Sequence, residues 1–331
     1  MLFLFIREKE DLLLYVAFTA ATGLLGNISM WGYLKGQVEK PVLKELRPLR
    51  HLKETLVYFI PTIATSVYTI LDKTMLGWFS GENKSQNGYY EYATGFVNMA
   101  KILIMSFNAV MSARMSYLFG NGQMEEIHKR IRESLDFVLL MAMPIMLGLA
   151  GSAAQFITWI LGNGYPPVTF LMYVCSPLVL VVGLSDCIGS QILTPGGKRA
   201  QSGKVIVAGA MVNACLNFLL IPHFAALGAA AASVAAECFI TSLYLWLGRD
   251  FIKLKMLVRY GWRRLVAAVI MLGAVVWTGQ FLEQVRGLGP ITTFIQIGAG
   301  AMVYFLVLLV MRDPFLYQYL GKIYRRLTGQ P

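Results

Sequence analysis

The chain has 331 residues, of which 56% are hydrophobic and 14% are charged. Soluble domains carry roughly 25% charged residues, so this composition excludes an ordinary soluble protein and indicates a protein with several membrane helices. The net charge of +11 would suit a nucleic-acid surface, and the distribution of the basic residues along the chain decides that question.

Nine apolar segments of membrane-spanning length follow one another along the chain. Crossing the hydrocarbon core takes about 20 apolar helical residues, and strands would leave open edges in lipid, so each segment is predicted to be a helix. The predicted spans are residues 12–34, 52–79, 89–118, 134–161, 168–193, 204–221, 224–248, 264–284 and 288–311. Between the third and fourth spans, residues 120–137 predict a separate short amphipathic helix, with Met124, Ile127 and Ile131 on one side.

The Lys and Arg residues lie mostly on one side of this arrangement. Of the 29, 23 fall in the loops 35–53, 114–132, 198–204 and 249–264 and in the C-terminal tail, whereas four fall in the loops of the opposite side. Cytoplasmic loops of membrane proteins carry the excess of positive charge. The basic residues therefore predict a cytoplasmic C-terminus and an external N-terminus, and no nucleic-acid partner.

The first residues, "MLFLFIREKED", combine a short apolar run with a charged cluster. They lack the basic start and small-residue cleavage site of a signal peptide. They resemble the end of a preceding membrane helix, so the chain is expected to be incomplete at its N-terminus.

No sequence motif predicts a metal enzyme. The four cysteines lie inside apolar runs, and neither CxxC nor HExxH occurs. The external loops are too short for the catalytic groups expected of a membrane enzyme such as a polysaccharide polymerase or ligase, so the chain is not expected to be an enzyme.

Several ionisable residues lie within the predicted spans, where charge is costly and indicates function. Asp72 and Lys73 end the second span, and Lys101 lies within the third. At about 1.5 Å of rise per residue, Asp72, Lys101, Asn217 and Ser233 fall in one layer of the external half. Asn213 shares a helix face with Asn217, four residues away. Asp186 and Glu237 also lie in or near the middle of spans, as candidate proton carriers or ion-pair partners.

Two interpretations of this layer stay open. A carboxylate, two amides and a hydroxyl provide the hard oxygen ligands of a small cation, which makes Asp72, Asn213, Asn217 and Ser233 candidate ligands of a coupling ion, Na⁺ or H⁺, with no other metal or cofactor expected. The alternative is structural: hydrogen bonds between helices for the amides and hydroxyl, and an ion pair between Asp72 and Lys101.

Three stretches together resemble one family. They are "HLKETLVYFIPTIATSVYTILDKTMLGWFS" (51–80), "YYEYATGFVNMAKILI" (89–104) and "QILTPGGKRAQSGKVIVAGAMVNACLNFLLIPHFAALGAAAASVAAECF" (191–239). The combination is similar to polysaccharide-biosynthesis flippases of the O-antigen and teichoic-acid exporter type, in the multidrug/oligosaccharidyl-lipid/polysaccharide (MOP) exporter superfamily.

The resemblance implies a fold and a domain organisation. The expected fold is an all-α polytopic bundle whose spans resemble helices six to fourteen of a MATE-like fourteen-helix exporter. Residues 1–34 would then hold the last helix of an incomplete first lobe, 35–53 a basic cytoplasmic linker, 54–248 the second six-helix lobe, and 249–331 a C-terminal helix pair with a basic tail.

The resemblance also implies roles for the polar residues. A lipid II flippase of the same superfamily holds sodium between helices that correspond to those bearing Asp72, Asn213, Asn217 and Ser233. Lys73, Lys101 and Arg114 become candidates for binding the pyrophosphate of a lipid-linked oligosaccharide in a cationic cavity, since Lys and Arg bind phosphate. A snorkelling role at the membrane interface is the alternative for Arg114.

The function implied by the resemblance is transport of undecaprenyl-pyrophosphate-linked oligosaccharide across the bacterial inner membrane for surface polysaccharides such as O-antigen. Membrane lipids and polysaccharide polymerase or chain-length machinery are the expected partners. The alternatives are a cation-coupled multidrug exporter of the same superfamily, or a fragment without function.

Overall fold

A computed structural model describes residues 12–32, 52–79, 81 and 85–317. The chain divides into two compact units, Met1–Lys53 and Glu54–Pro331, each of which is considered by itself. Most of the predicted basic linker 35–53 and the end of the tail lie outside the described residues.

The first unit contributes one described α-helix, α2 (Leu12–Trp31). Its sequence is apolar apart from a few polar residues, and two of its hydroxyls bond within the helix: Thr22 donates to the carbonyl of Phe18 at 2.8 Å, and Ser29 to that of Gly26 at 2.7 Å. Such internal bonds let hydroxyls remain in lipid at low cost.

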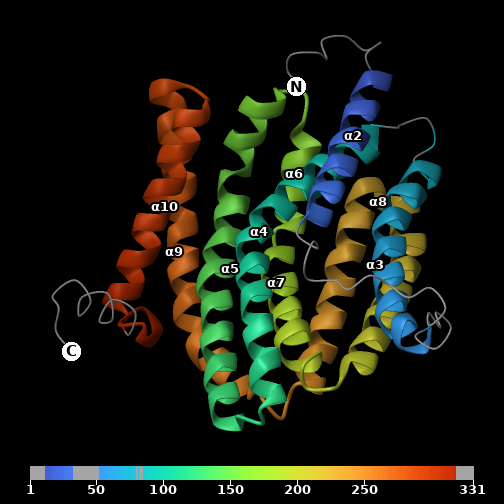
Figure 1. Cartoon of the computed structure of the whole chain (residues 1–331). Coiled ribbons are helices and arrows are strands. Elements are labelled where there is room, and N and C mark those ends of the chain that lie inside the picture. The colour runs from blue at the N-terminus through green and yellow to red at the C-terminus, as the bar shows by residue number, and fades with distance from the viewer. Residues whose placement is uncertain (1–11, 33–51, 80, 82–84, 318–331) are drawn as a thin grey trace. The chain divides into compact units, whose positions relative to one another are not determined.

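The second unit is built from helices that run alternately up and down (Figure 1). They are α3 (Leu52–Phe79), α4 (Ser85–Gly120), α5 (Met124–Leu161), α6 (Pro166–Cys175), α7 (Leu178–Ile188), the π-helical turn η5 (Gly189–Leu193), α8 (Arg199–Leu247), α9 (Leu254–Arg286) and α10 (Pro290–Val310). The described part of the chain contains no strand, and each of the nine predicted spans overlaps a helix. The predicted all-α membrane bundle is thus confirmed.

Six helical segments among the described residues are long and apolar enough to cross a membrane: Ser85–Gly120, Met124–Leu161, Pro166–Leu193, Arg199–Leu247, Leu257–Arg286 and Pro290–Val310. The third of these combines α6, α7 and η5. Pro177 lies between α6 and α7, where it has no amide hydrogen to continue the helical ladder.

The structure corrects the prediction of a separate amphipathic helix at 120–137. The chain turns only at residues 121–123, and α5 then runs without interruption from Met124 to Leu161. No helix breaker occurs before Pro144, and Ile127 and Ile131 are fully buried, so their apolar stripe continues into the core. Met124 is exposed instead of sharing that face.

Helix α8 is a hairpin of two antiparallel arms that corresponds to two predicted spans. The break falls at Ala225, whose backbone (φ 47°, ψ −128°) is not helical, three residues after Pro222. Gly228 follows on the second arm, and a Cβ atom there would lie 2.5 Å from the carbonyl oxygen of Leu220. The tight reversal therefore needs glycine at this position.

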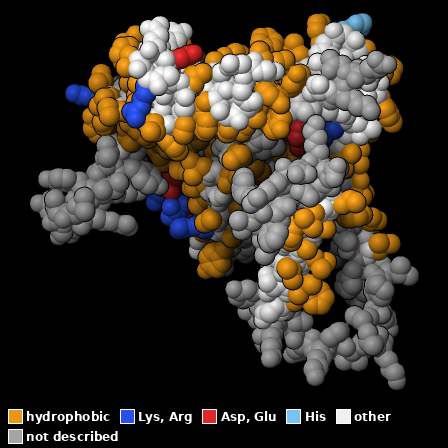
Figure 2. All heavy atoms as spheres, turned by 90° about the horizontal axis from the view of Figure 1, so that it is seen from above, with side chains coloured by type: hydrophobic (Ala, Val, Ile, Leu, Met, Phe, Trp, Pro, Cys, Tyr) orange, Lys and Arg blue, Asp and Glu red, His pale blue; other side chains and the backbone are white. Residues whose placement is uncertain are grey.

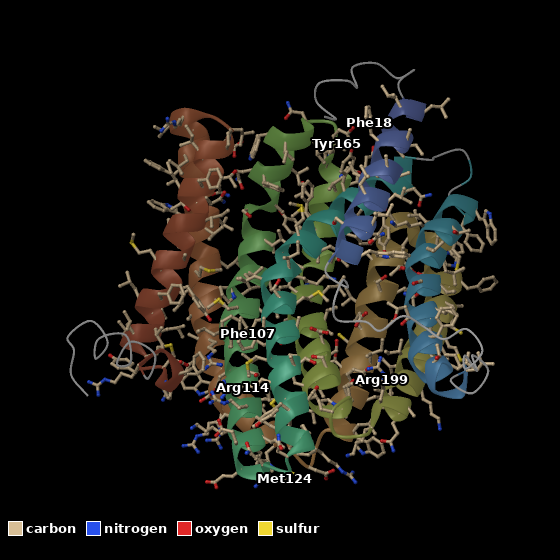
Figure 3. The ribbon with its side chains drawn as sticks, viewed as in Figure 1. Phe18, Phe107, Arg114, Met124, Tyr165 and Arg199 are labelled. Carbon is tan, nitrogen blue, oxygen red and sulfur yellow. The ribbon has the colours of Figure 1, made fainter. Side chains whose placement is uncertain are left out.

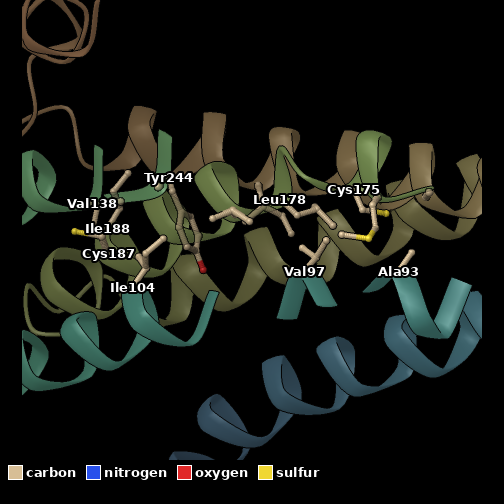
Figure 4. Close-up of a cluster of buried hydrophobic side chains, with 14 of the residues drawn as sticks. Ala93, Val97, Ile104, Val138, Cys175, Leu178, Cys187, Ile188 and Tyr244 are labelled. Carbon is tan, nitrogen blue, oxygen red and sulfur yellow. The ribbon is translucent and has the colours of Figure 1, made fainter. Parts of the chain in front are cut away.

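The main core lies among α4, α5, α6, α7 and α8. Figure 4 shows part of it, with Val97 and Ile104 from α4, Leu178 and Ile188 near the ends of α7, and Tyr244 from α8. A second apolar cluster joins α9 and α10 to α5, through residues such as Leu140, Met271 and Tyr304. The C-terminal helix pair is thus packed on the same bundle.

Large apolar side chains remain exposed on the outside of several helices. Val110 of α4 is 73% exposed, Phe294 of α10 74% and Val310 of α10 82%. In Figure 2 hydrophobic side chains occupy much of the visible surface. A soluble protein rarely exposes so large an apolar area, whereas the hydrocarbon core of a membrane covers it.

Candidate functional site

Asp72, near the end of α3, is buried in a shell of hydrogen-bond donors. Its side chain is 2% exposed. The Oδ1 atom accepts a bond from the amide of Asn217, and Oδ2 accepts bonds from the hydroxyls of Ser233 at 2.9 Å and Tyr90 at 3.0 Å. Three donors from α4 and both arms of α8 thus stabilise the carboxylate, which would otherwise be costly inside a membrane.

The two asparagines lie four residues apart on the first arm of α8 and so share one face. Asn217 also donates to Oδ1 of Asn213 at 3.0 Å. Both residues are fully buried, and the Oδ1 atom of Asn217 and the Nδ2 atom of Asn213 lack a partner among the described residues. The structure therefore brings the four predicted cation ligands together and leaves one amide oxygen of the set unsatisfied.

Tyr90 is a member of this cluster that the sequence analysis missed. Its hydroxyl lies 3.1 Å from that of Ser233 as well as 3.0 Å from Asp72. It stands one turn into α4, just after the connection from α3, so the helix reversal returns it to the level of Asp72. This position after the helix reversal could have predicted that Tyr90 lies near Asp72. The sequence analysis counted Tyr90 as an apolar residue and so did not consider its hydroxyl.

A small cavity of about 160 Å³ adjoins the cluster. Asp72, Tyr90 and Ser233 line it, together with Lys73 and Glu91, which form an ion pair between α3 and α4. The side chains of that pair are 48% and 60% exposed. The amine of Lys73 is therefore paired with the carboxylate of Glu91, a residue that the sequence analysis did not consider.

A larger cavity of about 430 Å³ extends from the same level toward the end of the bundle at which α8 begins. Lys101 and Glu237 line both cavities, and Asp186 and Arg199 line the larger one. The linings thus combine both signs of charge, where the resemblance implied a cationic cavity. Carboxylates near the amine and guanidinium reduce the cost of holding those cations in the membrane.

Arg114 stands apart from this region. It lies about 20 Å further along α4 than Lys101, at 1.5 Å per residue, near the end of the bundle (Figure 3). Its side chain is 53% exposed and lies 4.0 Å from Glu126 at the start of α5. The structure brings Lys73 and Lys101 to the cavities but does not bring Arg114 there.

The alternative ion pair between Asp72 and Lys101 is not formed in this structure. The salt bridges among the described residues do not join these two side chains, and hydroxyl and amide groups surround Asp72 instead. The described residues also contain no group of three or more His, Cys, Asp or Glu side chains that would hold a metal ion.

Comparison with known proteins places this geometry in context. A family model described as "Polysaccharide biosynthesis protein" matches residues 28–169. A protein of Escherichia coli (strain K12) named as an O-antigen transporter is 24% identical over 250 residues, 75% of this chain and 60% of that protein. A protein of Haloferax volcanii named as a low-salt glycan biosynthesis flippase is 23% identical over 279 residues, 83% of this chain and 57% of that protein.

Two solved structures share the fold. The lipid II flippase MurJ in an inward closed conformation matches with a TM-score of 0.64 and 17% identity, over 82% of this chain and 58% of that one. An outward-facing multidrug resistance transporter of the MATE family and MOP superfamily matches with a TM-score of 0.50 and 14% identity, over 78% and 64%. The chain spans about 60% of the length of the relatives it matches. By these comparisons the chain is similar to proteins of polysaccharide biosynthesis, and it shares its fold with MurJ and with the MATE transporter.

Proposed function

We propose that the chain acts in a flippase that moves undecaprenyl-pyrophosphate-linked oligosaccharide across the bacterial inner membrane. The observation that carries the proposal is the pair of adjoining cavities inside the helix bundle, both lined by Lys101 and other charged residues. An amine held in a membrane cavity suits the pyrophosphate of a lipid-linked sugar, whose hydrocarbon tail remains in lipid. The names of the curated relatives support the same substrate class.

The basic ends of the helices give this proposal an orientation. Near the connections at one end of the second unit lie Lys129, Lys198, Arg249 and Arg263. By the positive-inside rule they support a cytoplasmic location for that end. The substrate would therefore enter the larger cavity from the cytoplasmic side and leave past the Lys73–Glu91 pair. Polysaccharide polymerase or chain-length machinery would use the exported product.

Binding of a synthetic polyprenyl pyrophosphate by the purified chain tests the proposal without requiring complete transport. We expect Lys101→Ala to lower affinity markedly and Lys101→Arg to retain much of it, because the interaction needs a cation. Lys129→Ala is the matched control, since Lys129 is exposed on α5, outside both cavities. Equal affinity of the Lys101→Ala variant and the unmodified chain would contradict the role of Lys101.

The same reconstituted chain distinguishes the two transport classes. Movement of a labelled lipid-linked sugar between the leaflets of liposomes, followed by its accessibility to an impermeant reagent, reports flippase activity. Ion-driven movement of a cationic dye, without movement of the labelled lipid, would instead favour the multidrug exporter.

We further propose that Asp72, Asn213, Asn217 and Ser233 bind the coupling cation, with Na⁺ as the ion expected. The donor set supports this: carboxylate, amide and hydroxyl oxygens are hard ligands, and the unpaired Oδ1 of Asn217 is an oxygen available to a cation. A cation that binds one conformation more tightly than another shifts their populations by that difference alone.

Thermal unfolding in detergent tests the cation site. A ligand that binds only the folded state stabilises it by about 2.7 kcal/mol at 100 times its dissociation constant. Replacing choline by Na⁺ is therefore expected to raise the melting temperature of the unmodified chain and to leave that of Asp72→Asn unchanged. If Na⁺ stabilises both equally, or neither, the cluster is only a set of interhelical hydrogen bonds.

A further inference from the structure

A second buried polar cluster lies on the cytoplasmic side of the first, between α4 and the end of α7. Asp186 of α7 accepts a hydrogen bond on Oδ2 from the amide of Asn108 at 2.9 Å. Asn108 in turn accepts one on Oδ1 from the amide of Gln191 at 3.0 Å. Asn108 and Gln191 are fully buried, and none of the three takes part in the proposed cation site.

The π-helical turn η5 explains how Gln191 reaches this cluster. In a regular α-helix a residue five positions further on lies about 140° round the axis. The wider turn, closed by the bond from the amide of Thr194 to the carbonyl of Gly189, brings Gln191 round toward the face of Asp186. Such turns inside membrane helices occur frequently at functional positions.

The hydrogen bonds of this cluster run in one direction and leave one acceptor without a donor. Gln191 donates to Asn108, and Asn108 donates to Asp186, as a charged carboxylate requires. The Oε1 atom of Gln191 is buried without a partner among the described residues. An unsatisfied buried acceptor costs about 1–3 kcal/mol. Turning the amide of Gln191 over would leave its Nε2 donor unpaired instead, so the carboxylate at the other end sets the direction.

A proton on Oδ1 of Asp186, the carboxyl oxygen that accepts no bond from Asn108, leaves these side chains in place. Oδ2 is then the carbonyl oxygen of the neutral acid and still accepts the bond from the amide of Asn108. Asn108 also keeps its bond to the carbonyl of Gly183 at 3.2 Å, because its amide does not turn. The cluster therefore stabilises either protonation state of the carboxyl group.

Asp186 also has access to protons, because it lines the larger cavity with Ser185 and Ser190. The charged and titratable groups that line the same cavity are Lys101 on α4 and Arg199, Glu237 and Tyr244 on α8. Cys187, next to Asp186 on α7, is buried. Helix α5 presents Val138, an apolar residue, to Gly183 one turn before Asp186.

We propose that Asp186 is a proton-binding site open to the larger cavity, with Asn108 and Gln191 as positioning residues that stabilise its charged and neutral forms in turn. A proton from cavity water adds to Oδ1 of the carboxylate, and the same proton returns to cavity water when the group ionises again. This site is separate from the Asp72 cluster and does not depend on which solute the chain transports.

Infrared difference spectroscopy of the whole chain in lipid nanodiscs tests the proposal directly. The spectra are recorded between alkaline and mildly acidic pH, a range in which exposed carboxyl groups remain ionised. A protonated carboxyl group shows a carbonyl stretch that the carboxylate lacks. We expect one such band in the unmodified chain, its loss in Asp186→Asn, and its retention in Glu237→Gln, the matched change at a second carboxyl group of the same cavity. Asp186→Glu should keep a band at a shifted frequency.

The positioning role has its own readout. Asn108→Leu removes both the donor and the acceptor next to Asp186, so the pH at which the band appears should shift, whereas Ser116→Ala on an exposed turn of α4 should leave it unchanged. A band that persists in Asp186→Asn, or the absence of any titrating acid band in the unmodified chain, would overturn the proposal. Size-exclusion chromatography identifies variants that fail to fold. If Asp186→Asn is one of them, the shifted band expected of Asp186→Glu tests whether the band belongs to residue 186.

Discussion

At the scale of single residues, the hydroxyl of Tyr90 decides how the buried carboxylate of Asp72 is stabilised. It donates to Asp72 and contacts Ser233, so it connects α4 to both other elements of the cluster. By helix propensity and hydropathy alone, this tyrosine cannot be distinguished from the apolar residues around it. Its importance follows from the polar atom at the end of the ring, which has to find a partner when buried.

Tyr90→Phe is expected to lower the stability of the chain by about 1 kcal/mol or somewhat more, because it removes one hydrogen bond to a charged group and keeps the ring. The melting temperature in detergent measures the change. Tyr117→Phe, at a side chain that is 67% exposed on the same helix, is the control and should have little effect. Equal melting temperatures for the two variants would mean that the Tyr90 hydroxyl contributes nothing to the shell of Asp72.

At the scale of elements, the α8 hairpin depends on the close approach of its two arms. A Cβ atom on Gly228 would lie 2.5 Å from a backbone oxygen of the first arm, a contact that no side-chain movement relieves. Gly228→Ala is therefore expected to reduce the yield of folded protein strongly. Gly273→Ala in α9, where a Cβ atom would have no neighbour within 4 Å, should be neutral or slightly stabilising.

The same comparison measures whether the hairpin is a rigid element. If Gly228→Ala accumulates and elutes like the unmodified chain, the two arms can separate without loss of the fold. The positions of Asn213 and Asn217 on one arm and Ser233 on the other would then be less constrained than the structure indicates.

A buried arginine of α9 joins this helix to α5 through an ion pair. Arg264 is completely buried, with Nη1 3.0 Å from Oδ1 of Asp136 and Nε 3.4 Å from Oδ2 of Asp313, the residue that caps the turn after α10. Removing one partner of such a group leaves uncompensated charge in the interior and costs about 3–5 kcal/mol.

Arg264→Leu is accordingly expected to lower the melting temperature by an amount equivalent to about 3–5 kcal/mol. Adding Asp136→Asn and Asp313→Asn should recover part of the loss, because the buried negative charges are then also removed. Arg263→Leu is the neighbouring control, since its guanidinium donates to the exposed carbonyl of Arg312 and lies over the ring of Trp262, and the salt bridges among the described residues do not include it. Failure of the triple variant to recover any stability would show that Arg264 acts through packing and not through charge.

At the scale of the whole molecule, the alternation of helices fixes which connections lie together, and the basic residues assign those ends to the two sides of the membrane. In a background without the exposed Cys215 and Cys238, Asn163→Cys between α5 and α6 should react with an impermeant reagent on intact cells. Asn121→Cys between α4 and α5 should react only after permeabilisation. The reverse pattern would invert the proposed orientation and the direction of transport.

The sequence by itself determined the all-α membrane architecture, because a bilayer permits few ways to satisfy a backbone and the apolar lengths and basic loops report them directly. It also indicated that Asp72, Lys101, Asn217 and Ser233 share a layer, because helical rise converts sequence position into depth, and that Asn213 shares a helix face with Asn217. Depth along a helix does not specify which way a side chain faces round it. The tertiary structure alone therefore decided that Tyr90 joins Asp72, that Glu91 engages Lys73, that Arg114 stands apart from the cavities, and that a π-helical turn brings Gln191 into line with Asn108 and Asp186.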